Sequence, residues 1–248
     1  MAEDEIRKHT KAIYSVAKSA NMSWKHKLEE ILLEIIIIIF AVTVSIWLHN
    51  WSDKQKDNRE EKEFLTGLKT DLESDIEHLY GSKKFYENSL HGITYLLKVA
   101  AGVPSNADSV RIYGTIFLSS TNLEPNISRY EALKGSGKFS IIENNQLLSE
   151  IINVHQQTFS HIQILNNIFN DNNLNKIQPF IAANLQMDTS FNIINTEQVL
   201  RTAQMKFYLL NMHALLSENI INAHTDAINQ CKELITNIDE ELNERHNN

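Results

Sequence analysis

The feature that most constrains this chain is an apolar run close to its N-terminus. From Ile31 to Leu48 there is one charged residue, Glu34, and the sequence turns polar again at Asn50. A helix rises ~1.5 Å per residue, so this run would cross most of the ~30 Å hydrocarbon core of a bilayer. We therefore predict a transmembrane helix over residues 29–51.

Tryptophans flank the predicted span. Trp24 precedes it, and Trp47 and Trp51 lie at its far end. Indole rings favour the headgroup layer because they are largely apolar but carry one polar N–H, so we interpret these three residues as membrane-interface anchors. The run is longer than the apolar core of a cleavable signal peptide and ends without a small-x-small cleavage site, which favours an uncleaved anchor.

The orientation of the span is not decided by charge. Lys25 and Lys27 precede the span and Lys54 and Lys56 follow it, so the positive-inside rule favours neither side. We favour a cytoplasmic N-terminus. Residues 1–28 are basic and amphipathic, and they fit either a helix on the inner membrane surface or a partly ordered tail.

The totals of the 248-residue chain exclude several classes of protein. The formal net charge of −8 argues against a nucleic-acid partner, because a phosphate backbone attracts clustered Lys and Arg. Cys231 is the one cysteine, which excludes an internal disulfide framework and a zinc site built from several cysteines.

Two long stretches carry apolar residues alternately three and four positions apart, the pattern of a helix that packs along another helix. The first follows the span and stops at Gly102 and Pro104, and the second runs from about Thr196 to Glu244. An antiparallel pair is the economical arrangement. The first stripe includes Leu65, Leu68, Leu72, Ile76, Leu79, Tyr86, Leu90, Ile93 and Leu97, and the second includes Leu200, Phe207, Leu210, Ile221, His224, Ile228, Cys231, Ile235, Ile238 and Leu242.

Shorter helices are predicted between these two stretches. They cover Asp108–Ser119, a piece opened by a capping box of Ser128 and Glu131 and closed by Gly135, Asn145–Phe169 with a break at Asn172–Asn173, and Leu174–Leu185. Strand signals are almost absent. The predicted fold class is all-α: one N-terminal transmembrane helix that continues into an elongated, coiled-coil-like antiparallel bundle formed by residues 52–248.

No motif for catalysis is recognisable, and we expect no enzyme activity, no cofactor and no metal. Gly135-Ser136-Gly137-Lys138 has the end of a phosphate loop, but Ala132 and Phe139 replace the glycine and the Ser or Thr that the loop requires. The ten histidines lack the close spacing of a metal-binding helix. His224 and Cys231 fall in the apolar stripe and are interpreted as core residues. The carboxylates between Glu60 and Glu77 are interpreted as a solvated helix face.

Glu34 is a candidate functional residue. An ionisable side chain inside a span is costly and often marks an ion or proton route. Glu34 lies about one turn inside the span, so it can instead reach the near interface or hydrogen bond to a neighbouring helix. In an oligomer, several copies of Glu34 would form a ring of carboxyl groups.

Two passages resemble a family of single-pass membrane proteins of Gram-negative bacteria that is catalogued as a domain of unknown function. The first passage is Leu33-Glu34-Ile35, followed by the aliphatic run to Asn50-Trp51 and then Glu63-Phe64-Leu65. The second is Tyr130-Glu131-Ala132-Leu133-Lys134-Gly135-Ser136-Gly137, here called the motif turn, followed by Ile141-Ile142-Glu143-Asn144. The resemblance implies an inner-membrane anchor with a helical domain outside the cytoplasm, in the periplasm, and it implies no activity.

Within the motif turn, Tyr130, Leu133, Lys134, Gly135 and Gly137 are candidate site residues, and we expect the turn at the membrane-distal end of the bundle. The sequence favours a membrane-anchored helical scaffold or interaction protein that self-associates. Its expected partners are the lipid bilayer, other copies of the chain, or another membrane or periplasmic protein, and no nucleic acid. The alternatives are an ion- or force-coupled membrane component that uses Glu34, and a sensor with a ligand pocket between its helices.

Overall fold

The structure is a computed structural model that describes residues 7–8, 10–11, 14, 24–190 and 192–246. Helices dominate the described residues, with one isolated pairing between Met187 and Ile193, so the all-α prediction is confirmed. The predictions for residues 1–28 lie largely outside the described part of the chain. Two compact units make up the chain, Met1–Glu61 and Lys62–Asn248. Helix α2 (Trp24–Ala100) contributes residues to both.

In the first unit, α2 presents its apolar run to the outside. None of the residues from Ile31 to Leu48 is buried by the rest of the chain. Among the described helices, α2 is the one that is long and apolar enough to cross a membrane. The large apolar residues that are exposed there include Leu32, Leu33, Ile35, Ile36, Ile37, Ile39, Phe40, Val42, Ile46, Trp47 and Leu48.

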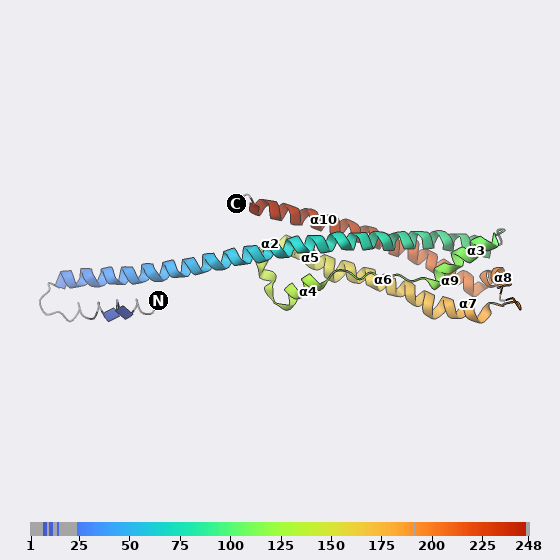
Figure 1. Ribbon diagram of the computed structural model, residues 1–248, viewed down its shortest axis with the longest axis horizontal. Helices are drawn as coiled ribbons and strands as arrows, with labels where there is room; N and C mark the ends of the chain where they lie inside the picture. Colours follow the sequence, from blue (N-terminus) through green and yellow to red (C-terminus); the bar gives the residue numbers. More distant parts are fainter. Residues whose placement is uncertain (1–6, 9, 12–13, 15–23, 191, 247–248) are drawn as a thin grey trace. The chain divides into compact units, whose positions relative to one another are not determined.

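The second unit, from Lys62 onward, contains three long helical segments (Figure 1). The first is the remainder of α2. The second consists of α5 (Asn145–Asn153), a π-helical stretch (Val154–Thr158), α6 (Phe159–Asp171), a π-helical stretch (Asn172–Ile177) and α7 (Gln178–Asn184). The third consists of α9 (Ala203–Ala214), a π-helical stretch (Leu215–Ile220) and α10 (Ile221–His246).

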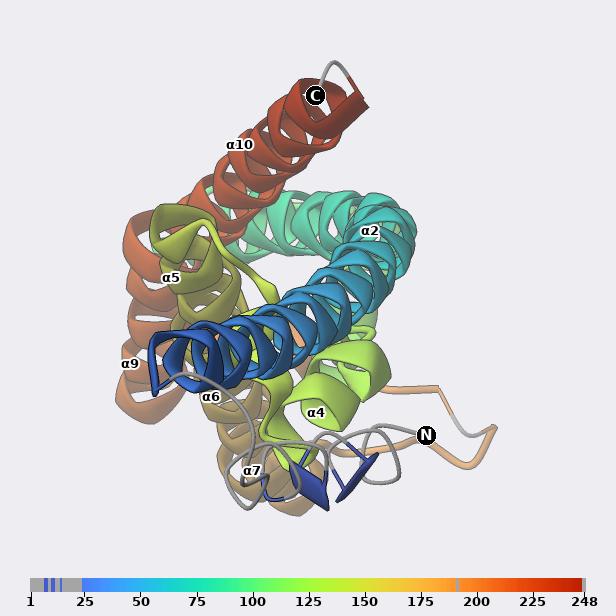
Figure 2. The same ribbon diagram turned by 90° about the vertical axis from the view of Figure 1, so that its left-hand side faces the viewer.

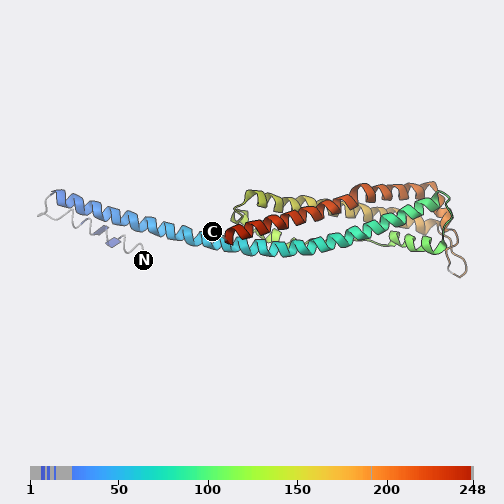
Figure 3. The same ribbon diagram turned by 90° about the horizontal axis from the view of Figure 1, so that it is seen from above.

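The third segment runs antiparallel to α2, as the sequence predicts (Figure 3). Lys69 Nζ lies 2.7 Å from Asp239 Oδ1, and Lys232 Nζ donates to the Tyr80 hydroxyl at 2.8 Å. The sequence numbers of these partners rise along α2 while they fall along α10, which fixes the relative direction of the two helices.

Short elements connect the three segments. After α2 come α3 (Ala107–Gly114), a 3-10 helix (Thr115–Leu118), α4 (Ser128–Gly135) and a second 3-10 helix (Lys138–Ile141), while α8 (Thr196–Arg201) precedes α9. The end-on view in Figure 2 shows α4 on the α2 side of α6. Helix α2 ends as predicted: Gly102 has a φ of 101°, and its neighbour Val103 donates its N–H to Lys98 O at 3.0 Å, which closes the helix.

The core of the second unit is formed by the first predicted stripe and by the α10 part of the second. The α9 part of the second stripe is wrong, because Phe207 and Leu210 are 60% and 58% exposed and α9 buries Met205, Leu209 and Met212 instead. Leu65, Leu68, Leu72 and Leu79 of α2 are fully buried in one cluster with residues of α4, α5 and α10. Tyr86 and Ile93 are fully buried in a second cluster with residues of α6 and α9. Cys231 is also fully buried, as interpreted from the sequence, and this burial raises the pKa of its thiol to about 12.

Several local predictions are wrong. Asn172 and Asn173 do not break the second helical segment, because a π-helical stretch accommodates them and the backbone stays helical. Ser128 forms no capping box, because the N-cap position is Ile127, whose side chain makes no capping hydrogen bond. The C-terminal helix is interrupted at Thr202, where ψ is 149° and the hydroxyl accepts from Met205 N at 3.3 Å, so Thr202 caps a new helix.

Candidate functional site

The first six residues of the motif turn belong to helix α4, which lies against the part of α2 where the second unit begins. The expectation that it occupies the membrane-distal end of the bundle, where α2 stops, is wrong. The contacts of α4 and of the segment before it fall on the Gly67–Asp75 part of α2. Sequence periodicity could not reveal this, because the chain from Ser119 to Ile127 runs back along the bundle without a regular pattern.

Arg129, the residue just before the motif turn, attaches α4 to α2. Its Nε lies 2.9 Å from Asp71 Oδ2. Its guanidinium crosses Gly67, where an added Cβ would lie 2.2 Å from Arg129 Cζ. Gly67 therefore provides space for a close approach of the arginine to the helix backbone.

Tyr130 joins α4 to the second helical segment. Its ring stacks on His155 with a centroid distance of 4.5 Å and an interplanar angle of 17°. Its hydroxyl accepts from Gln156 Nε2 at 2.6 Å. Tyr130 and His155 are 1% and 7% exposed, so the pair belongs to the core.

His155 is held as a neutral residue. Its Nδ1 lies 2.9 Å from Ile151 O, which fixes the tautomer with a proton on Nδ1. Burial lowers the pKa of His155, and this outweighs the opposite effects of the Ile151 carbonyl, Asp71 and Glu131. A neutral, enclosed imidazole is a poor acid at neutral pH, so its stacking contact is its main contribution here.

Asp75 fastens the segment before α4. Its Oδ1 accepts from both the backbone N–H and the Nδ2 of Asn126, each at 2.9 Å. Asp75 is fully buried, and desolvation raises the pKa of its carboxyl despite the two hydrogen bonds from Asn126. The interpretation of this carboxylate as part of a solvated face is therefore wrong, and Glu61 is fully buried as well.

The remaining candidate residues of the motif turn shape the end of α4. Leu133 is 7% exposed and packs in the core, and α4 ends at Gly135. Gly137 has a φ of 69°, a conformation that favours glycine. Lys134 lies at the surface, 3.3 Å from Glu131 Oε1. Together with the contacts of Arg129 and Tyr130, these contacts make α4 a docking element between α2 and the π-helical stretch Val154–Thr158.

The candidate residues of the apolar run lie in the first unit. Glu34 is half-buried in α2. Trp47 and Trp51 are exposed, and the side chain of Trp24 lies outside the described residues. Their predicted roles depend on a membrane and stay predictions.

A second buried polar group was missed by sequence reasoning. The Tyr86 hydroxyl donates to Asn166 Oδ1 at 2.7 Å, and the Tyr86 ring meets His224 edge-on at 5.2 Å. His224 Nδ1 lies 2.8 Å from Ile220 O, the same arrangement that His155 makes with Ile151. Desolvation lowers the pKa of His224, as it does for His155. The apolar stripe placed Tyr86 and His224 in the core, but nothing in it paired Tyr86 with Asn166.

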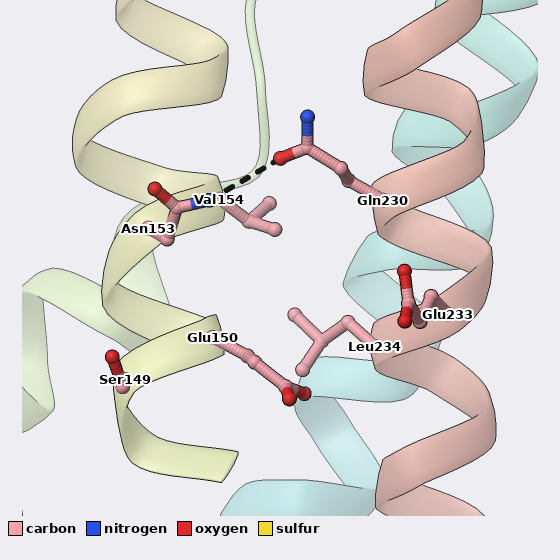
Figure 4. A pocket seen from close by; sticks show the side chains of 7 residues that line it. All are labelled: Ser149, Glu150, Asn153, Val154, Gln230, Glu233 and Leu234. Atoms are coloured by element: carbon pink, nitrogen blue, oxygen red, sulfur yellow. Dashed lines mark hydrogen bonds between the residues drawn. The ribbon is translucent and has the colours of Figure 1, made fainter. Parts of the chain in front are cut away.

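A hollow of about 340 Å³ separates α5 from α10 (Figure 4). Asn153 Nδ2 donates to Gln230 Oε1 across it at 3.3 Å, and Glu150 Oε2 accepts from Asn237 Nδ2 at 2.6 Å. Its polar groups thus bond to one another and join the two helices. Among the residues that the structure describes, no group of three or more His, Cys, Asp or Glu is arranged to hold a metal ion.

The chain belongs to the DUF6090 family, a family of unknown function whose model matches residues 34–180. The match starts within the apolar run, includes the motif turn and stops in α7, so it leaves out α8, α9 and α10. No curated protein and no solved structure matches the chain.

Proposed function

We propose that this DUF6090 chain is a membrane-anchored helical interaction protein that self-associates. One helix would cross the inner membrane of a Gram-negative bacterium, with the N-terminus in the cytoplasm and the helical unit in the periplasm. Its role would be to hold an interaction surface at the membrane rather than to catalyse a reaction. Its partners would be other copies of the chain or another membrane or periplasmic protein.

The observation that carries the anchor is that α2 is apolar around its whole circumference from Leu32 to Leu48. Consecutive residues such as Ile35, Ile36 and Ile37 are 41%, 62% and 39% exposed, so the apolar surface is not a single stripe. A helix that is apolar all round requires an apolar environment on every side, which a protein core or a bilayer provides. None of this window is buried by the chain itself, which favours the bilayer.

Fractionation of cells that express the full chain tests the anchor. Ile36→Lys with Phe40→Lys should release the chain from alkali-washed membranes, because each lysine near the centre of a span costs about 2.5–3.5 kcal/mol. The matched control is Ile164→Lys with Ile168→Lys, an equally spaced exposed pair of α6. A chain that is soluble before any substitution would refute the anchor.

Self-association must use surfaces other than the buried stripes. Leu65, Leu68 and Leu72 are already covered within one chain, so the first stripe is not available for self-association. Phe207 and Leu210 of α9 remain 60% and 58% exposed on neighbouring turns. We expect Phe207→Ser with Leu210→Ser to lower the mass of the full chain measured in detergent by light scattering. A monomeric wild-type chain would contradict self-association but not the anchor.

The ion-coupled alternative rests on Glu34, the one charged residue between Ile31 and Leu48. Glu34→Gln removes the charge and keeps the shape of the side chain. Unchanged proton flux through vesicles that contain the variant, compared with the wild-type chain, would exclude this role.

A further inference from the structure

A large cavity lies at the end of the second unit where α2 stops. Its volume is about 1040 Å³, which is at the upper end of the ~300–1,000 Å³ range of protein pockets that enclose drug-sized ligands. Residues of α2, α3, the following 3-10 helix, α7, α8 and α9 line it, at the end of the unit where α3, α7 and α8 gather (Figure 1).

The inner wall of the cavity is apolar. Leu96, Val110, Phe117, Leu200 and Met205 line it, and each is at most 5% exposed. These residues are part of the buried cluster around Tyr86 and Ile93, so the cavity is continuous with the core of the unit. An apolar hollow of this size is poorly suited to water, because water needs several polar partners in such a site.

The connection between α7 and α8 forms one lip of the cavity. Asn195 holds it by accepting from Gln186 N at 2.8 Å and by donating its Nδ2 to Asn184 O at 2.9 Å. This arrangement presents Ile193 and Ile194 at the cavity, where they are 48% and 59% exposed. Leu118, the last residue of the 3-10 helix that follows α3, also lines the cavity and is 76% exposed. The lips therefore carry apolar side chains that an occupant would cover.

Each charged residue that lines the cavity already has a partner. Asp108 Oδ1 lies 3.5 Å from Arg111 Nη2, and Glu197 Oε2 lies 2.9 Å from Arg201 Nη2. Glu197 also accepts from the Ser105 hydroxyl. The other polar lining residues, which include Thr115, Gln178, Thr196 and Gln198, are uncharged. The rim thus offers hydrogen bonds, and the two carboxylates against one guanidinium among its described residues disfavour an anionic headgroup.

We propose that this cavity binds an uncharged amphiphile with one long alkyl or isoprenoid chain. The chain of the ligand would fill the apolar wall between Leu96 and Met205, and its hydroxyl or amide headgroup would lie at the rim beside Ser105 and Thr196. A fatty-acid anion would fit the volume equally well, but its carboxylate would lie at a rim that carries Asp108 and Glu197 against Arg111, the one cation among the described lining residues.

Gly114 provides a variant that fills the cavity. It lines the cavity, and a Cβ added there would meet no heavy atom within 4 Å, so Gly114→Phe should occupy the space without a clash. The matched control is Gly81→Phe, because Gly81 lies in α2 away from the cavity and its Cβ position is equally open. Ala182→Phe, at an exposed lining position of α7, is a second filling variant.

The test uses the full chain in mixed detergent micelles and a monoacylglycerol that carries a photoactivatable diazirine in its alkyl chain. Peptides that acquire the label are identified by mass spectrometry. We expect label on peptides from α3, α7 and α8, reduced roughly tenfold or more by Gly114→Phe, because the added ring and the alkyl chain of the ligand could not both fit in the cavity without overpacking. Gly81→Phe should leave it unchanged. Unlabelled monoacylglycerol should compete, while the matching fatty acid at a pH where it is ionised should compete poorly.

Three results would overturn the proposal. Label confined to the apolar run of α2 would show that the probe reports only the micelle. Label on the cavity peptides that persists in both Gly114→Phe and Ala182→Phe would show that the probe reaches these peptides from outside the cavity. Equal competition by the fatty-acid anion would refute the uncharged headgroup. Thermal unfolding of each variant, followed by circular dichroism, separates loss of binding from loss of the fold.

Discussion

Helix α2 contains two apolar patterns that the structure treats in opposite ways. In the first unit, apolar residues follow one another without interruption, and Phe40 is 69% exposed. In the second unit, they recur every three or four positions, and Leu65, Leu72 and Tyr86 are fully buried. The same residue types thus serve two environments, and their spacing decides which. A stripe can be covered by neighbouring helices of the same chain, whereas an all-round apolar surface requires an apolar solvent.

The largest expected difference in stability between the two regions of α2 comes from removing one aromatic ring that packs in each environment. Phe169 is fully buried, and its ring centroid lies 5.1 Å from that of Tyr86. We expect Phe169→Ala to lower the free energy of unfolding of the full chain in detergent by about 3–5 kcal/mol, because it leaves a cavity in a packed core.

Phe40→Ala is the matched control for that substitution. Its ring packs against no core of the chain, so denaturant unfolding of the helical signal of the second unit should be unchanged. A large loss of stability from Phe40→Ala would show that the apolar run is buried in protein, and the contrast between the two regions would fail.

Acid should weaken the second unit through its two buried histidines. Burial lowers the pKa of His155 and of His224 below the ordinary value of 6.5, so the unfolded chain binds protons more readily than the folded one. Above pH 6.5 both histidines are neutral in the folded and in the unfolded chain, so they do not change the free energy of unfolding. As the pH drops below 6.5 toward the lowered pKa values of the folded state, the free energy of unfolding falls. The slope is at most ~1.4 kcal/mol per pH unit for each histidine.

Urea unfolding at a series of pH values between 7 and 5 measures this slope. His224→Phe keeps an aromatic ring beside Tyr86 and should remove about half of the slope, while His161→Phe, at an exposed position of α6, should not change it. The raised pKa of Asp75 acts in the opposite direction, because the folded state then takes up a proton more readily as the pH falls. A slope that survives in the His155→Phe, His224→Phe double variant would assign the acid sensitivity to other groups.

Sequence reasoning recovered what depends on local spacing. The all-α class, the buried stripe from Leu65 to Ile93, the end of α2 at Gly102 and the burial of Cys231 all follow from periodicity or from backbone requirements within a few residues. The contacts of α4 could not be obtained this way. Arg129 meets Asp71 and Asn126 meets Asp75 only because the chain folds back, and a single sequence carries no periodic signal for such a pairing.

The cavity was equally invisible to sequence reasoning, because its lining residues belong to six elements and the loop between α7 and α8. The Glu61 and Asp75 carboxylates show a related limit. Charge alone indicates a solvated face, and only the tertiary neighbours decide whether a particular carboxylate is covered.

Substitutions at the glycines of α2 should give the smallest stability changes among the tests of the contrast between its two regions. The apolar run from Ile31 to Leu48 contains no glycine, whereas the second unit places Gly81 and Gly92 in the same helix. At Gly92 an added Cβ would lie 2.3 Å from Ile116 Cδ1 and 2.8 Å from Tyr113 Cδ1, while at Gly81 it would meet nothing within 4 Å.

Gly81→Ala should therefore stabilise the second unit by up to about 1 kcal/mol through helix propensity alone. Gly92→Ala should lose this gain and destabilise it by about 1 kcal/mol or more, because Ile116 and Tyr113 must shift. Thermal unfolding of the two variants measures the difference, and equal stabilisation by both would mean that α3 and the following 3-10 helix do not pack against α2.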